Sequence, residues 1–312
     1  INGSNVSTVP TAISVTNPAQ PNITSVGILT SINVSGVSNI TSILATNLNV
    51  TNLSNLVNLT TVYDVLVGSV RVGMGANMVA TDTVLGSGVL LNDTGGYNTA
   101  LGYTAMSGSQ PYVGYDTAVG AATLENDFGP GYNTAIGAGA MVNSTPSQGQ
   151  DVAVGFSTMQ VDTGAGYNTA IGTYSMKNSS PGGGYDTSVG YYAMSNDTGP
   201  GYNTAIGSEA MQSANPSGGY DTAVGWQSLQ NDSGSYNTAI GANSGQGITG
   251  GTYNTALGAG AGPYSGSLNN TTAIGAGAQP TISSVAVFPL GVNVGVNTGA
   301  PGSTLEVQGN IY

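Results

Sequence analysis

The sequence predicts an all-β chain: a parallel β-solenoid of about eleven to twelve short rungs. Three observations lead to this fold class: a heptapeptide that recurs at near-constant spacing, 50 Gly among 312 residues, and only 5% charged residues. Typical soluble proteins carry about 25% charged residues and about half this share of Gly. Hydrophobic residues still make up 39% of the chain, which favours a folded structure with many turns over disorder.

The heptapeptide reads GYNTAIG at Gly131, Gly166 and Gly201, and GYDTSVG or GYDTAVG at Gly184 and Gly219. Its tyrosine position recurs every 16 to 18 residues, and the position after it alternates between Asn and Asp through most copies. The loops alternate too, with NDTG-like loops before the Asn copies and Pro-bearing loops before most of the Asp copies. The period is therefore about 35 residues, built from two related half-repeats.

Each half-repeat is expected to form two short strands. Residues 97–101 (YNTAL) alternate with the period of a strand, Gly102 turns the chain, and residues 103–106 (YTAM) give a second segment. Met or Leu stands four residues after each turn Gly as far as Leu229. We expect one large aliphatic, one Met or Leu and two Ala per rung to fill the interior.

Such a core is small. Burying two large apolar side chains contributes roughly 3–6 kcal/mol, against about 1–2 kcal/mol for ordering each residue. Packing three copies around one axis would bury further apolar faces, so we infer a homotrimer. At about 4.8 Å per rung the rod would be on the order of 50 Å long.

Three regions are expected along the chain. Residues 1–80 are rich in Val, Ile, Thr, Ser and Asn and predict a β-rich intertwined shaft. Residues 81–278 hold the 35-residue double repeats of the solenoid. Residues 279–312 predict a C-terminal β segment.

The Asn/Asp alternation has a structural and a metal-binding interpretation. Stacked Asp side chains at about 4.8 Å would repel each other, and interleaved Asn doubles their separation. The predicted structural ladder consists of Asn98, Asn133, Asn168, Asn203, Asn237 and Asn254. The weaker alternative is a row of Ca²⁺ ligands, and its candidates are Asp116, Asp151, Asp186 and Asp221. The G-G-x-G-x-D pattern of Ca²⁺-binding solenoids is absent, so no metal or cofactor is expected.

Two resemblances add to this interpretation. The stretches NTAIGAGAM and NTAIGSEAM resemble the head repeats of trimeric autotransporter adhesins, which implies a trimeric parallel β-roll. The stretch at 21–36 is similar to shaft repeats of viral and phage fibres, and the stretch at 294–312 to the segment before an intramolecular chaperone of endosialidase type. This second resemblance implies that a chaperone follows and is removed, with Tyr312 as the possible processing end.

Composition excludes several functions. Arg71 and Lys177 are the only basic residues, so we expect neither nucleic-acid binding nor adhesion to anionic membranes. His and Cys are absent and no acidic pair has an activating neighbour, so the chain is not expected to be an enzyme. No apolar run is long enough to span a membrane, and no membrane insertion is expected.

Recognition residues are less specific. Trp226 and the Tyr series could stack on sugars, although regular Tyr rows more often stack on each other. N-x-S/T sequons make the chain a candidate glycoprotein. The glycosylation candidates are Asn22, Asn33, Asn39, Asn49, Asn52, Asn58, Asn92, Asn143, Asn178, Asn196 and Asn231.

Taken together, the sequence predicts a structural fibre, extracellular or on a virion surface as in a tail fibre, serving as a stiff trimeric spacer that supports attachment. The chain itself would be its main partner, as a homotrimer and in an end-to-end filament. The alternative is an adhesin or other ligand-binding solenoid, for a host surface glycan or receptor, or for ice. Ice binding favours two outward Thr per rung, whereas one recurs here, as at Thr99, Thr117 and Thr134.

Overall fold

The computed structural model describes residues 64–75, 79–92, 95–109, 114–145, 149–179, 184–214, 218–292, 294–296, 302 and 305–307. The chain divides into two units, residues 1–59 and 60–312. The first unit, and with it most of the expected shaft, lies outside the described residues. The second unit carries the repeats.

A 15-stranded sheet runs through the repeats in chain order from β1 to β15. The first two strands, β1 (Val65–Val67) and β2 (Val70–Gly73), form an antiparallel hairpin, and β2 pairs antiparallel with β3 (Thr83–Gly86). Thereafter each coil of the chain contributes one strand. These strands are β4 (Thr99–Leu101), β5 (Thr117–Val119), β6 (Thr134–Ile136), β7 (Val152–Val154), β8 (Thr169–Ile171), β9 (Thr187–Val189), β10 (Thr204–Ile206), β11 (Thr222–Val224), β12 (Thr238–Ile240), β13 (Thr255–Leu257), β14 (Thr272–Ile274) and β15 (Ala286–Val287).

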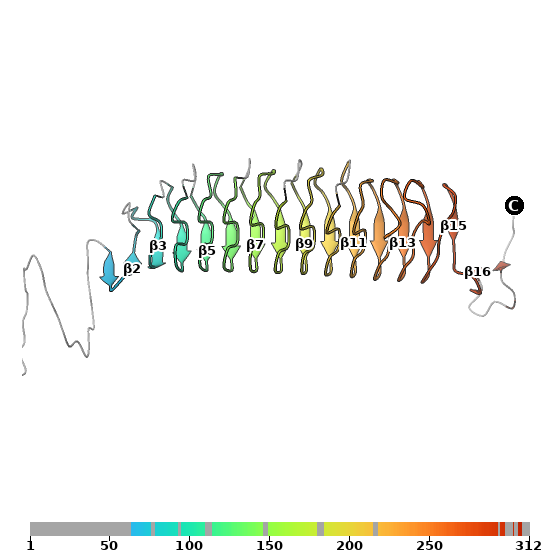
Figure 1. Ribbon diagram of the computed structural model, residues 1–312, viewed down its shortest axis with the longest axis horizontal. Helices are drawn as coiled ribbons and strands as arrows, with labels where there is room; N and C mark the ends of the chain where they lie inside the picture. The colour runs from blue at the N-terminus through green and yellow to red at the C-terminus, as the bar shows by residue number, and fades with distance from the viewer. Residues whose placement is uncertain are drawn as a thin grey trace, which may run out of the picture. The chain divides into compact units, whose positions relative to one another are not determined.

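All neighbours from β3 to β15 pair in parallel, and equivalent residues of successive repeats face each other, as Thr204 faces Thr222. Figure 1 shows these strands side by side, one from each coil of the chain. The prediction of an all-β parallel solenoid is confirmed. Parallel pairing continues past residue 278, because β15 pairs with β14. A separate two-stranded parallel sheet joins β16 (Val294–Val296) and β17 (Leu305–Val307).

The glycine that ends each strand is required by the close stacking of coils. Gly172, for example, has φ +130°, and a Cβ there would lie 2.5 Å from the carbonyl oxygen of Gly190 in the next coil. L-residues with side chains rarely adopt this φ, and no side chain fits the space. Gly therefore recurs at this position because both the backbone angle and the neighbouring coil demand it.

The second strand expected in each half-repeat does not form. Residues 103–106 are bends and turns, and Thr104 and Met106 both have positive φ, +52° and +53°. The Thr104 N–H donates to the preceding coil (Ser87 O, 2.9 Å) and the Met106 N–H to the following one (Thr123 O, 2.9 Å). The segment is hydrogen-bonded between coils as a strand would be, but its alternating dihedral angles are not those of a strand.

The interior also differs from the expectation in one respect. The Met or Leu row and the strand alanines are buried, as predicted, with Met141, Met176 and Ala170 at 0% exposure. The large aliphatic residue of each strand points outward instead, because it lies two residues after an outward Thr on the same face. The interior is therefore narrow, filled by Met or Leu, by Ala, and by the Asn/Asp position.

Candidate functional site

Tyrosines form two stacked rows along the outside of the coils. Adjacent ring centroids lie 4.7–5.0 Å apart with interplanar angles of 1–10°. The rows consist of Tyr97, Tyr115 and Tyr132, and of Tyr167, Tyr185, Tyr202, Tyr220, Tyr236 and Tyr253. Each ring covers the face of its neighbour, so only edges and hydroxyls face solvent within a row. This geometry disfavours the rows as sugar-stacking platforms, because a sugar stacks on a ring face.

Gln150 interrupts the tyrosine stack between Tyr132 and Tyr167. Its side-chain amide donates to the Tyr167 hydroxyl at 3.1 Å. Gln150 keeps the positive φ of the tyrosines around it, +79° against +72° and +70°. The interruption is therefore a change of side chain on an unchanged backbone.

Beside the tyrosines, the strands present two further rows on the same outward face. The first strand residue is Thr in most coils, and the third is Ile, Val or Leu. Ile171, Ile206 and Ile240 are 41–42% exposed, while the Ala between the two rows points inward and is buried. A half-exposed aliphatic row thus runs along the sheet from β3 to β14 without a charged residue in it.

The Asn/Asp position forms a continuous buried ladder. The side-chain Oδ1 of each residue accepts the backbone N–H of the equivalent residue in the next coil, as in Asp186 N–H to Asn168 (3.0 Å) and Asn203 N–H to Asp186 (2.7 Å). These bonds join the main-chain N–H of one coil to the side chain of the coil before it. The ladder positions with such a bond are Asp82, Asn98, Asp116, Asn133, Asp151, Asn168, Asp186, Asn203, Asp221, Asn237, Asn254 and Thr271.

The sequence interpretation missed a second buried aspartate in each double repeat. It lies eleven residues after the ladder Asp, in the NDTG-like loop, and the four are Asp127, Asp162, Asp197 and Asp232. In each loop its Oδ1 accepts the N–H of the Gly two residues later, at 2.7–3.0 Å. The constant spacing of eleven residues from one Asp to the other was the available signal.

The paired carboxyls carry strongly raised pKa values. Burial, followed by the charge of Asp162, raises the pKa of Asp151 to about 8. Burial raises the pKa of Asp162 to about 6 and that of Asp197 to about 7. Asp186 and Asp221 each reach about 8, chiefly through burial, with Asp197 and Asp232 as charged neighbours. The folded chain at neutral pH is therefore less negative than its formal charge of −12.

In two of these pairs, the Oδ2 atom of each carboxyl group has no hydrogen-bond partner within the described residues. These pairs are Asp151 with Asp162, and Asp186 with Asp197. A protonated carboxyl can donate, whereas two ionised carboxylates can only accept. Burial of both carboxyls in each pair thus favours the protonated form. No group of three or more acidic or other metal-ligating side chains lies together among the residues that the structure describes.

The glycosylation candidates fall into two sets. Asn22, Asn33, Asn39, Asn49, Asn52 and Asn58 lie outside the described residues, as does Tyr312. Asn92, Asn143, Asn178, Asn196 and Asn231 are all exposed. Asn178 donates its side-chain amide to Asn196 in the next coil at 3.3 Å, so glycans on both would be crowded.

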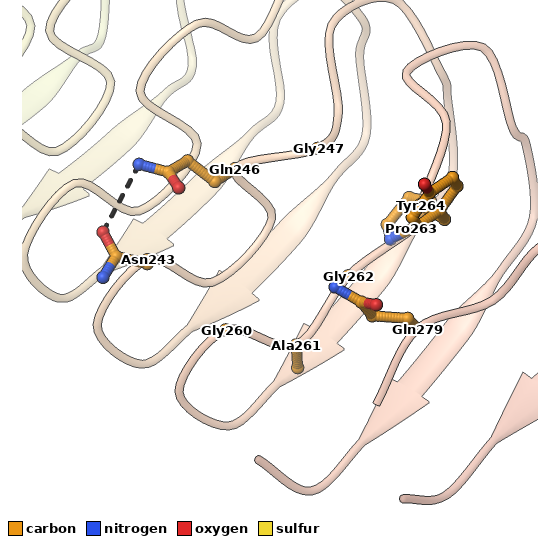
Figure 2. Close-up of a pocket in the computed structure, with 9 residues that line it drawn as sticks. All are labelled: Asn243, Gln246, Gly247, Gly260, Ala261, Gly262, Pro263, Tyr264 and Gln279. Carbon is orange, nitrogen blue, oxygen red and sulfur yellow. Dashed lines mark hydrogen bonds between the residues drawn. The ribbon is translucent and has the colours of Figure 1, made fainter. Parts of the chain in front are cut away.

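A hollow of about 400 Å³ interrupts the regular surface near the C-terminal end of the repeats. It lies on the segments that follow β12, β13 and β14, away from the outward strand rows. Figure 2 shows Asn243 and Gln246 on one side and Gln279 and Tyr264 on the other. The sequence interpretation did not find it, although the Met/Leu position changes to Gly245, Gly262 and Gln279 at this point.

Within the described part of the chain, no helix is long and apolar enough to cross a membrane. No protein-family model matches the chain, and comparison with curated proteins and with solved structures found no match.

Proposed function

We propose that the chain is the rod segment of a trimeric structural fibre, extracellular or on a virion surface, where it serves as a stiff spacer that supports attachment. The aliphatic row along β3 to β14 is the observation that carries this proposal. In a single chain it leaves side chains such as Ile171 and Ile206 about two-fifths exposed. Long continuous apolar surfaces on a soluble chain mark interaction sites.

A second copy of the same chain is the partner that fits this row best. The row has the length and spacing of the rod itself, so three copies aligned in parallel would match coil for coil. It carries no charge, and its Thr neighbours can hydrogen-bond or pack without repulsion between identical copies. Closed threefold packing would cover the row on every copy and leave no open apolar face.

The continuous ladders support the stiffness that a spacer requires. Each coil is bonded to the next through its strand, through the Asn/Asp side chain and through the tyrosine stack. Since all three follow the same axis, bending the rod would strain them together. Exposed sequons such as Asn143 agree with an extracellular location and would decorate the surface away from the strand rows.

The test is the mass of the purified chain in solution by light scattering coupled to size exclusion. Three chains of 30.8 kDa give about 92 kDa. Replacing both Ile171 and Ile206 with Asp should shift this to the mass of one chain, because charges would face each other across the contact. Val161→Asp, an exposed apolar residue on a turn, is the matched control and should keep the trimer.

A monomeric wild-type chain at micromolar concentration would overturn the trimeric spacer. So would a trimer that survives the double substitution unchanged. The ligand-binding alternative is favoured by one observation, the hollow near the C-terminal coils. For ice binding, the outward face offers one Thr row beside an aliphatic row, and thermal hysteresis of the purified protein would test it.

A further inference from the structure

The hollow beside Tyr264 arises where the repeat changes its core. Met or Leu fills the interior four residues after each turn Gly as far as Leu229, and Gly245 and Gly262 take that place in the next two coils. A Cβ on Gly245 would lie 2.6 Å from Leu229 Cδ2 and 2.9 Å from Ala239 Cβ, so the interior leaves no room for a side chain at this position. The hollow is lined by residues of these two coils and by Gln279 of the next.

The floor of the hollow is held by the coil-to-coil hydrogen bonds. The N–H of Gly262 donates to Ala278 O at 2.9 Å, and the N–H of Tyr264 donates to Pro280 O at 2.9 Å. Ala261, Gly262 and Pro263 are buried beneath the opening. The hollow is therefore part of the bonded framework of the solenoid, which gives a preformed site.

The lining is polar but carries no charge. Asn243, Gln246 and Gln279 contribute side-chain amides, each with both donors and acceptors. Gln246 donates to Asn243 Oδ1 at 3.3 Å (the dashed line in Figure 2), and this bond orients both amides at the rim. No charged residue occurs anywhere between Asp232 and Glu306 in the sequence. A charged ligand would find no counter-charge here, whereas hydroxyl groups would find matching donors and acceptors.

Tyr264 supplies a ring face, which the tyrosine rows do not. It is 75% exposed, and among the described residues no aromatic ring stacks on it. One open aromatic face beside several amides is the combination that recognises the apolar face and the hydroxyl edge of a sugar. A volume of about 400 Å³ lies at the small end of the range for ligand sites, about 300–1,000 Å³.

We propose that this hollow binds a neutral carbohydrate of one or two sugar units, with Tyr264 as the stacking platform and Gln279, Gln246 and Asn243 as hydroxyl partners. The site lies on the turn segments, so packing copies through the outward strand rows would leave it open. Each chain would carry one site near the end of the repeats, and a trimer would carry three at the same height of the rod.

The experiment uses the full chain on a printed array of neutral and sialylated glycans. Hits are then measured by saturation-transfer difference NMR with the corresponding methyl glycosides. We expect binding to a neutral glycan, with at least a tenfold loss of affinity in Tyr264→Ala and in Gln279→Ala. Tyr103→Ala removes a similarly exposed tyrosine (66%) far from the hollow and should bind as wild type.

Circular dichroism melts and the light-scattering mass, recorded on the same samples, separate loss of the site from loss of the fold. If Tyr264→Ala has a lowered melting temperature, Gln246→Ala serves as the second test variant. It changes only an exposed side chain at the rim, and it should show the same loss of affinity. Three results would overturn the proposal: no neutral glycan bound, binding restricted to sialylated glycans, or affinity unaltered in the hollow variants. A trimeric mass alongside any of these would leave the fibre function standing.

Discussion

The buried aspartate pairs predict that the solenoid loses stability as the pH rises. The pKa of Asp186 rises from 3.8 to about 8 on folding, because burial and the charges of Asp197 and Asp162 disfavour its ionised form. The folded chain therefore binds more protons than the unfolded chain between about pH 4 and pH 8. Stability from this group is fully present below pH 4 and is lost as the pH rises through 8.

The magnitude follows from the two pKa values. A shift from 3.8 to about 8 corresponds to roughly 6 kcal/mol of folding stability, lost between the low-pH and high-pH ends of the window, for Asp186 alone. For a chain of this size roughly 2–4 °C accompany each kcal/mol, so the melting temperature should fall by on the order of 10 °C or more. Asp151 and Asp221 add to the effect over the same window.

Two substitutions, one that removes a buried acid and one that adds a buried acid, test whether titration causes the pH dependence. Asp186→Asn keeps the oxygen that accepts the Asn203 N–H (2.7 Å) and removes the titrating group, so it should flatten the pH dependence and be the more stable form at pH 9. Asn203→Asp adds an acid to the ladder between Asp186 and Asp221, so it should steepen the dependence and melt earliest at pH 9. Both should lie close to wild type at pH 4.

The assay is the melting temperature by circular dichroism, measured from pH 4 to pH 9 at constant ionic strength. A wild-type melting temperature that rises over this range would refute the reasoning. So would an Asp186→Asn curve that runs parallel to wild type throughout, since the variant would then act through packing and not through titration.

Two further substitutions test the packing of the coils. Gln150→Tyr should raise thermal stability by about 1–3 kcal/mol, because the new ring would stack on Tyr132 and Tyr167 and join the two tyrosine rows, at the loss of one exposed hydrogen bond. A melting temperature at or below that of wild type would contradict the stacking account. Met176→Ala empties a fully buried position and should cost about 2–5 kcal/mol in denaturant unfolding, whereas Val161→Ala, exposed on a turn, should cost far less; equal losses would contradict the assigned interior.

The rung-like architecture could be predicted because the physical cause repeats in the sequence. The spacing of the repeats located the Gly that follows each strand. The alternation of Asn and Asp identified residues that stack from one coil to the next. The segment from Tyr103 to Met106 could not be predicted as turns. Positive φ at Thr104 and Met106 is unfavourable on local grounds, and only hydrogen bonds to both neighbouring coils compensate for it.

The large aliphatic residues of the strands were expected in the interior, and this expectation was wrong for a related reason. A pattern of period two says which residues share a face but not which face is inside. In this chain Asn168 and Ala170 point inward, so Thr169 and Ile171 must point outward. The hollow was missed because the sequence marks its place only by the absence of Met or Leu, at Gly245 and Gly262, and by no motif.

The alternation of Asn and Asp along the ladder also constrains how such a rod can change length during evolution. Removing a single coil between Asn168 and Asn203 would leave two Asn adjacent, which the chain already tolerates at Asn237 and Asn254. Removing an Asn coil would bring two buried aspartates into direct succession. Duplication or deletion of a whole double repeat preserves the alternation of Asn and Asp. The length would therefore change most readily in steps of two coils, about 10 Å per step.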